Sequence, residues 1–157
     1  MKSYTELLEG VYDPNIFKAF FMAGGPGSGK SYAVELGIGQ AQKGVKVTAQ
    51  GLKVVNSDDV FEKYLRDAQL NFKMDANQGK QRDALRQRAK VITKKKQDNY
   101  IEGRLGMVID GTGKDYNKIT TDASTLRQIG YDVHMIFVNT SLDVALERNQ
   151  RRPRKVP

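Results

Sequence analysis

The sequence of 157 residues contains no cysteine and a single histidine, His134. The absence of cysteine excludes disulfides, thiol catalysis and thiolate metal sites, and one histidine excludes a histidine-rich metal centre. No apolar run approaches the roughly 20 residues that a membrane-spanning helix needs. The first residues also lack the apolar stretch of a secretory signal. We therefore expect a cytoplasmic protein (host cytoplasm if the source is a virus) with no membrane partner.

The length and composition suit one ordinary globular domain. Hydrophobic residues make up 39% and charged residues 28% of the chain, which is typical of a folded, water-soluble domain. The chain is long enough for one hydrophobic core and too short for two. We therefore predict a single domain over residues 1–157.

The formal net charge is +8, and the positive charges are clustered. One cluster consists of Lys80, Arg82, Arg86, Arg88, Lys90, Lys94, Lys95 and Lys96, and the other of Arg148, Arg151, Arg152, Arg154 and Lys155. Such clusters favour polyanionic partners, namely nucleotide phosphates, nucleic acid or an acidic substrate. The alternative for the first cluster is a solvated helix surface, because its charges fall on several faces of the predicted helix.

Short apolar runs alternate with segments of helical composition along the chain. Strands are predicted over residues 17–23, 52–56, 105–109 and 131–138, and helices over 32–41, from 60, over 81–102, over 116–129 and from 141 or 142 to 148. Ser57 or Asp58 is expected to cap the second helix, and Gly130 to end the fourth. This alternation predicts a three-layer α/β fold, with a mainly parallel sheet of four to five strands and helices on both faces.

Residues 24–31 match the phosphate-binding pattern G-x-x-x-x-G-K-[ST] in full, between a predicted strand and a predicted helix. Glycines let the backbone N–H groups converge on phosphate oxygens, and the helix N-terminus adds positive charge. Lys30 is expected to reach the β- and γ-phosphates of ATP or GTP, and the Ser31 hydroxyl to bind Mg²⁺. The predicted nucleotide-binding residues are Gly24, Gly25, Pro26, Gly27, Ser28, Gly29, Lys30, Ser31 and Tyr32.

Carboxylates follow two predicted strands at the edge where ligands bind in open α/β sheets. Asp58 is the first candidate to accept the proton of a substrate hydroxyl, and Asp59 is the second candidate for that role. Asp110 is placed as an acid near the metal, and Thr112 and Lys114 as contacts of the acceptor. The alternatives are that Asp58 only caps a helix and that Asp110 is a turn residue before glycine.

Arginines follow the last predicted helix and form a candidate lid over the phosphates. Arg148 and Arg152 are four residues apart and share a helix face if the helix continues, although Pro153 favours an end there. Arginines in such positions accelerate phosphoryl transfer by roughly 10³–10⁵. Lys30, Asp58, Arg148 and Arg152 are thus the predicted catalytic residues. The alternative for the arginines is a solvated basic tail.

The segments 24–31, 56–59, 110–112 and 147–152 together resemble the P-loop kinase branch that contains zeta toxins and phage-type polynucleotide 5′-kinases. The resemblance to the polynucleotide kinases implies that Asp58 is the base and that Arg148 and Arg152 form the lid. The resemblance to zeta toxins implies that Asp110 and Thr112 hold a sugar-nucleotide acceptor. Zeta toxins usually have arginine where Lys114 stands, and polynucleotide kinases an arginine near the position of Phe61. A fifth strand or further helix normally follows the lid in this branch, which raises the alternative of a domain cut short.

Together these features predict a kinase that uses Mg²⁺ and transfers the γ-phosphoryl group of ATP or GTP to a hydroxyl group. The expected acceptor is a sugar nucleotide, a nucleoside or a polynucleotide 5′-hydroxyl. Two alternatives stay open: a nucleotide-binding ATPase or regulatory module without an acceptor, and a basic nucleic-acid-binding protein.

Overall fold

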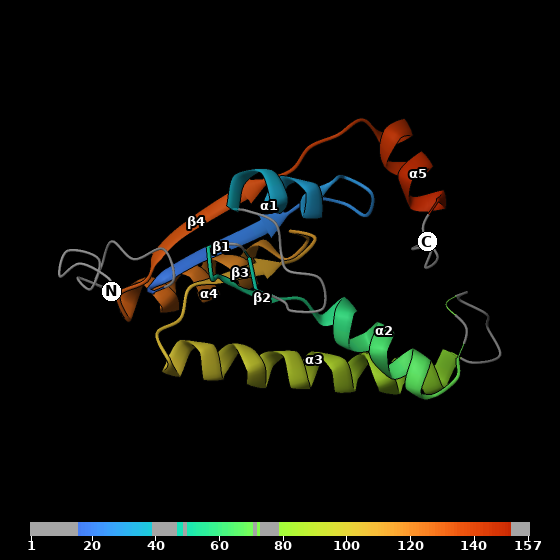
Figure 1. Cartoon of the computed structure of the whole chain (residues 1–157), viewed down its shortest axis with the longest axis horizontal. Coiled ribbons are helices and arrows are strands. Elements are labelled where there is room, and N and C mark those ends of the chain that lie inside the picture. The colour runs from blue at the N-terminus through green and yellow to red at the C-terminus, as the bar shows by residue number, and fades with distance from the viewer. Residues whose placement is uncertain (1–15, 39–46, 49, 71, 73–78, 152–157) are drawn as a thin grey trace, which may run out of the picture.

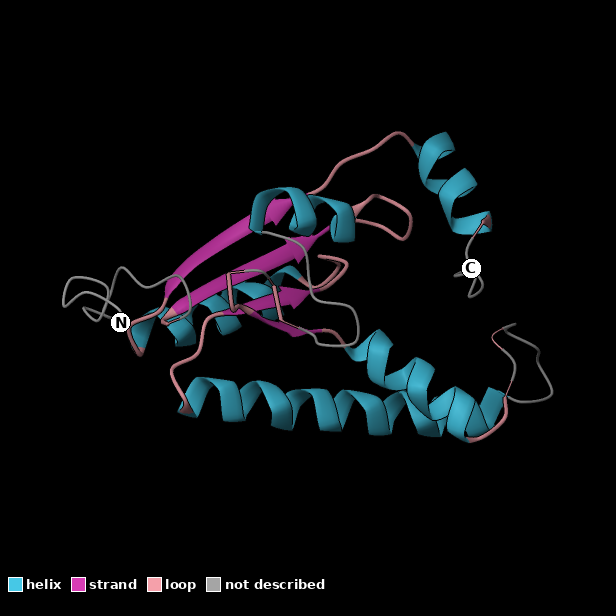
Figure 2. Cartoon of the chain, in the orientation of Figure 1, coloured by secondary structure: helices cyan, strands magenta, loops and turns pink. Residues whose placement is uncertain are grey.

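The fold is described from a computed structural model, which covers residues 16–38, 47–48, 50–70, 72 and 79–151. Its centre is a parallel four-stranded sheet in the order β2-β3-β1-β4 (Figures 1 and 2). The strands are β1 (Lys18–Ala23), β2 (Lys53–Val55), β3 (Met107–Asp110) and β4 (Asp132–Phe137). The predicted fold class is confirmed, with four strands in the described part of the chain.

Helices connect the strands, and each begins within three residues of its predicted start. They are α1 (Lys30–Ile38), α2 (Ser57–Asp67), α3 (Gly79–Glu102), α4 (Tyr116–Gln128) and α5 (Leu142–Gln150). Gly130 follows α4 with a φ of 96°, as expected for a helix that ends in the left-handed conformation. None of the helices in the described segments is both long and apolar enough to cross a bilayer.

Helices cover both faces of the sheet, so its central strands are buried. On one face, Ala19, Phe21 and Met107 pack with residues of α4 and the end of α3. On the other face, Met22 and Val108 pack with Leu52 and α1. Figure 1 shows α1 on one side of the sheet and α3 and α4 on the other. The central strands β1 and β3 alternate their apolar side chains between two covered faces, which accounts for their nearly continuous apolar sequences.

Helices α2 and α3 pack along each other and form a third apolar cluster beyond the sheet. Phe61 and Leu65 of α2 are 2% exposed, and Ala89 of α3 is fully buried. Arg86 lies over the Phe61 ring, with 5.4 Å between its guanidinium carbon and the ring centre, and Arg88 lies similarly over the ring of Tyr64 at 5.1 Å. Two arginines of the first basic cluster therefore pack on aromatic rings, so the cluster is not a uniformly solvated face.

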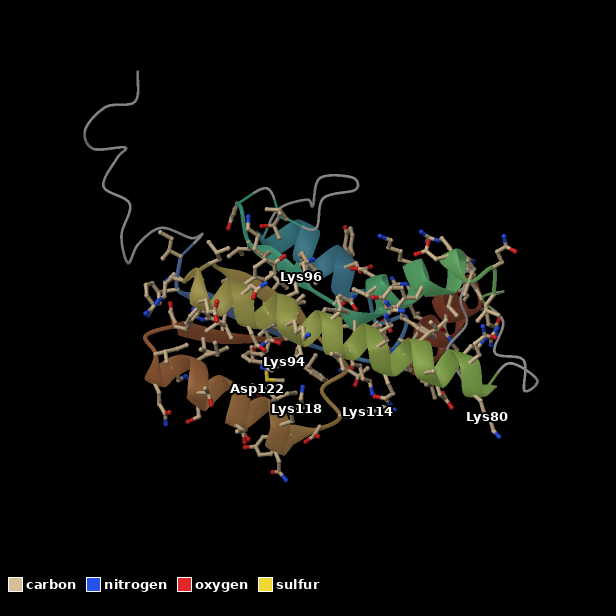
Figure 3. All side chains as sticks on the ribbon, turned by 90° about the horizontal axis from the view of Figure 1, so that it is seen from below. Lys80, Lys94, Lys96, Lys114, Lys118 and Asp122 are labelled. Atoms are coloured by element: carbon tan, nitrogen blue, oxygen red, sulfur yellow. The ribbon has the colours of Figure 1, made fainter. Side chains whose placement is uncertain are left out.

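Some lysines of this region form exposed ion pairs, while Lys96 lies over the ring of Tyr100 at 5.7 Å. Figure 3 shows Lys80 and Lys94 along α3 and Lys118 on the neighbouring α4. Lys94 forms an ion pair with Asp98 at 3.0 Å, and Lys118 with Asp122 at 3.6 Å. Exposed pairs of this kind contribute little to stability. The aspartates of these pairs also reduce the net positive charge of a surface that, from the sequence alone, could bind nucleic acid.

Candidate active site

The phosphate-binding pattern forms the loop between β1 and α1, at the carboxyl end of the sheet. β1 ends at Ala23 and α1 begins at Lys30. Gly27 and Gly29 have φ values of 81° and 98°, a region that glycine adopts without steric cost. The Gly24 N–H donates to the Thr112 carbonyl oxygen at 3.3 Å, which links the loop to the chain after β3. The local fold is therefore the strand, glycine loop and helix that the pattern requires.

Helix α5 packs directly against this loop. A Cβ atom at Gly27 would overlap the carbonyl oxygen of Ala145 and lie 3.0 Å from its carbonyl carbon. A Cβ atom at Gly29 would lie 3.3 Å from Nη1 of Arg148. The predicted lid arginine Arg148 thus reaches the loop from α5. Arg152, the other predicted lid arginine, lies outside the described residues.

The Lys30 side chain folds back over the loop that precedes it. Its Nζ donates to the carbonyl oxygen of Gly24 at 2.7 Å and to that of Gly25 at 3.3 Å. The ammonium group is thereby held at the mouth of the loop. A cation there, together with the N-terminal end of α1, creates a site that favours a phosphate group.

Asn56 connects the ends of β2 and β3 and also begins α2. Its side-chain oxygen accepts a hydrogen bond from the Asp58 N–H at 2.8 Å, and its Nδ2 donates to Oδ2 of Asp110 at 2.8 Å. The prediction that Ser57 or Asp58 caps this helix is therefore wrong, because the helix begins directly after β2 with Asn56 as its N-cap. The Asp58 side chain consequently lies in the first turn of α2 and does not serve as the cap.

A cavity of about 420 Å³ joins the loop to the ends of β2 and β3 and to α2 and α3. It is lined by Gly25, Pro26, Gly27, Ser28, Gly29, Lys30, Ser31, Asn56, Ser57, Asp58, Asp59, Glu62, Arg86, Asp110, Gly111 and Thr112. The cavity thus combines a phosphate-binding loop with carboxylates that can accept a proton. That combination is what phosphoryl transfer to a hydroxyl requires.

Most predicted site residues meet in this cavity. Lys30, Ser31, Asp58, Asp59, Asp110 and Thr112 line it, together with the loop from Gly25 to Gly29. Gly24 lines a neighbouring cavity, described below. Tyr32 is 65% exposed at the start of α1, and Lys114 is exposed after β3, and neither lines a cavity of this region. Their predicted roles stay predictions.

The cavity also contains Glu62 and Arg86, which sequence reasoning did not place in the site. Glu62 follows Asp58 by four residues on α2, and this helical spacing is a signal that could have identified it. Arg86 comes from α3 and reaches the cavity because α3 folds back along α2. In the sequence it is one member of a basic cluster, and no local pattern distinguishes it from its neighbours.

A second cavity, of about 340 Å³, lies on the other side of the loop, against α5. Its walls are Gly24, Gly25, Pro26, Ser28, Phe137, Val138, Asn139, Thr140, Leu142, Ala145, Leu146 and Asn149. Phe137, Leu142 and Leu146 are 67%, 71% and 49% exposed, although their side chains are apolar. Exposed apolar surface beside a phosphate loop suits a flat aromatic ligand group.

The oxygen donors of the first cavity suit magnesium. Ser31 and Asp110 both line it, and hydroxyl and carboxylate oxygens are ligands that Mg²⁺ prefers. Among the described residues, no group of three or more His, Cys, Asp and Glu side chains is arranged to hold a metal ion. Any Mg²⁺ held by Ser31 and Asp110 would therefore take its other ligands from nucleotide phosphates and water, as it commonly does.

The opposite end of the sheet carries a separate polar cluster. Asp132, at the start of β4, forms an ion pair with Lys18 at 2.8 Å and lies 3.0 Å from Nε2 of His134. The hydrogen bonds from Lys18 and His134 hold the pKa of the Asp132 carboxyl below its ordinary value. His134 also stacks on the Phe20 ring at 5.2 Å. Because this cluster lies at the amino end of the parallel strands, it is remote from the cavity, and His134 lies on the strand at one edge of the described sheet.

Comparison with known proteins identifies the family and the fold. A profile of the family described as Zeta toxin matches residues 10–157. A structure reported for the PezAT chromosomal toxin–antitoxin system of Streptococcus pneumoniae is similar, with a TM-score of 0.59 at 15% identity. A candidate kinase from Chloroflexus aurantiacus is similar with a TM-score of 0.57 at 14% identity. The curated protein sequences contain no match.

The length of these relatives differs from that of the present chain. The similar region covers 85% of this chain in both structural comparisons, but 51% of the Streptococcus protein chain and 65% of the Chloroflexus protein. The chain thus spans about half to two thirds of their lengths. At these identities the likeness establishes the α/β kinase-type fold, whereas substrates and partners need separate arguments.

Proposed function

The chain belongs to the zeta toxin family, and from that premise we propose that it is a kinase that transfers the γ-phosphoryl group of ATP or GTP to a hydroxyl group. The observation that carries the proposal is the cavity in which Lys30 and the phosphate loop face Asp58 and Asp110. A phosphate site alone would fit an ATPase. The carboxylates on the facing wall are what a kinase needs in addition, because the acceptor must lose a proton.

In the proposed reaction, the acceptor oxygen forms a bond to the γ-phosphorus as the bond between that phosphorus and the β–γ bridging oxygen breaks. The Asp58 carboxylate takes the proton of the acceptor hydroxyl, and ADP or GDP leaves. Lys30 and Arg148 offset the negative charge on the phosphate oxygens from two sides of the loop. Mg²⁺, when bound at Ser31 and Asp110, would supply further neutralisation of the phosphates.

We place the nucleobase in the apolar cavity between the loop and α5. Support comes from its position beside Gly24–Ser28 and from the exposed side chains of Phe137, Leu142 and Leu146. A purine ring buried against them would remove apolar surface from water. Asn139 and Asn149 line the same cavity and carry amide groups that can hydrogen-bond the edge of a base.

Asp59, Asp110 and Thr112 are proposed to contact the acceptor. A sugar nucleotide is the first candidate acceptor, because the family match favours it, and a nucleoside or polynucleotide 5′-hydroxyl is the second. The resemblance to the polynucleotide kinases stays a prediction, as does the catalytic role of Arg152.

The direct test uses γ-labelled ATP and GTP with UDP-sugars, nucleosides and 5′-hydroxyl DNA and RNA as acceptors. We expect labelled product from one class, and a loss of roughly 10²–10⁴ in rate for Asp58→Asn with nucleotide affinity unchanged. Asp67→Asn, an exposed change at the far end of the same helix, is the matched control. Label released only as inorganic phosphate would instead support an ATPase, and a normal rate for Asp58→Asn would remove Asp58 from the reaction.

A further inference from the structure

Arg86 is a cation of the first cavity that the proposed chemistry leaves without a role. Among the residues described as lining this cavity, the positively charged ones are Lys30 and Arg86. Lys30 is held on the phosphate loop by the carbonyl oxygens of Gly24 and Gly25. Arg86 enters from α3, on the side of Asp58 and Glu62, which lies across the cavity from the loop. The two cations therefore serve different ends of the cavity.

The guanidinium of Arg86 is held in place by its surroundings. It lies 5.4 Å above the ring of Phe61, and that ring is only 2% exposed within the α2–α3 cluster. A guanidinium over an aromatic face is attracted to the ring and keeps its N–H donors available at its rim. The neighbouring arginines of α3 do not share this position, since Arg82 is buried and Arg88 packs over Tyr64, and neither lines the cavity.

The remainder of this wall is acidic. Asp58, Asp59 and Glu62 lie within the first turns of α2, and Asp110 ends β3. Arg66 lies 3.7 Å from Glu62 but does not line the cavity. Arg86 is therefore the cation that an acceptor on this side of the cavity can reach, and its planar set of donors matches the oxygens of a phosphate or carboxylate group.

We propose that Arg86 binds an oxyanion of the acceptor and thereby selects acceptors that carry one near the reacting hydroxyl. This inference rests on the proposed function, because it divides the cavity into a donor end at the loop and an acceptor end at α2 and α3. The oxyanion is a phosphate, as in a nucleotide or sugar nucleotide, or a carboxylate, as in a uronic acid. Both present paired oxygens to a guanidinium.

The experiment measures binding directly, so that it does not depend on catalytic turnover. With an imido analogue of ATP and Mg²⁺ present, the protein is titrated with UDP-glucose against uridine, and with glucuronate against glucose. We expect the anionic member of one pair to bind more tightly. Arg86→Gln should weaken that binding by roughly 10- to 100-fold, as expected for a charge-assisted hydrogen bond, while the neutral member changes less than twofold.

Arg88→Gln is the matched control, because it removes the same charge from the same helix outside the cavity. Arg86→Lys retains the charge without the planar donor set and should recover part of the affinity. Thermal unfolding of each variant reports any loss of the contact with Phe61. Equal affinity of wild type and Arg86→Gln for every anionic probe would overturn the proposal, as would a wild-type protein that prefers neither anion. Failure of the proposed function would show separately, as label from γ-labelled ATP or GTP that reaches none of the acceptors.

Discussion

Substitution of Gly27 by alanine should impair catalysis as well as stability, because Gly27 is where α5 rests on the phosphate loop. The φ of 81° at this residue lies in the left-handed region, where an L-residue costs roughly 1–2 kcal/mol. The added Cβ would also lie 3.0 Å from the carbonyl carbon of Ala145. Carbon atoms in ordinary contact are about 3.5–4.0 Å apart, and the overlap with the Ala145 carbonyl oxygen is more severe, so α5 must move away by roughly 1 Å.

That displacement carries Arg148 with it, since Arg148 is part of α5. Its Nη1 now lies 3.3 Å from the position of a Cβ at Gly29, close to where the transferred phosphate is proposed to bind. A misplacement of about 1 Å in a positioned catalytic group can lower a rate by roughly 10²-fold. We therefore expect Gly27→Ala to lower kcat by about that factor, measured with labelled ATP and whichever acceptor the labelling assay identifies. The free energy of unfolding should fall by more than the roughly 1–2 kcal/mol of backbone strain alone, because the Ala145 backbone must also shift.

Gly130→Ala is the matched control. Gly130 has a φ of 96°, but a Cβ there meets only side-chain atoms of Phe17, at 3.6 and 3.8 Å, which is ordinary contact. This variant should therefore lose only the roughly 1–2 kcal/mol of backbone strain in urea unfolding while kcat stays near that of the wild type. If Gly27→Ala and Gly130→Ala have the same kcat, the contact between α5 and the loop has no catalytic importance and the reasoning fails.

Three further predictions concern other parts of the molecule. Asn56→Ala should lower the free energy of unfolding by roughly 2–3 kcal/mol in urea melts, since it removes both the α2 cap and the bond to Asp110; a loss below about 0.5 kcal/mol would contradict this. The pKa of Asp132 is lowered by its bonds to Lys18 and His134, so the ion pair stabilises the protein above the ordinary carboxyl pKa and this stabilisation is lost as pH falls through the lower folded pKa. Asp132→Asn should therefore flatten the stability profile on the acid side, below the ordinary carboxyl pKa; an unchanged profile would count against the pair. Leu146→Asp should weaken Mg·ATP but not Mg·tripolyphosphate, whereas Ile129→Asp, an exposed apolar control, should weaken neither; parallel loss of both ligands would argue against a base site beside α5.

The nucleotide site was largely predictable because its determinants are local. The spacing of glycines, Lys30 and Ser31 within 24–31 specifies a backbone path, and the flanking apolar run and helical segment specify its context. The element order followed from alternation of apolar and polar segments, with ends accurate to a few residues. The α2 cap was mispredicted, since asparagine, serine and aspartate cap helices about equally well and only the exit of the chain from β2 decides among Asn56, Ser57 and Asp58.

Composition and order along the chain therefore determined the phosphate loop, the layered fold and the carboxylates at the strand ends. Tertiary structure alone decided that Arg86 enters the cavity from α3, that Arg148 reaches Gly29 from α5, and that Asn56 joins two strands. The physical reason is distance along the chain: a local pattern constrains a backbone over a few residues, whereas these contacts arise from the packing of elements whose relative positions depend on the whole core.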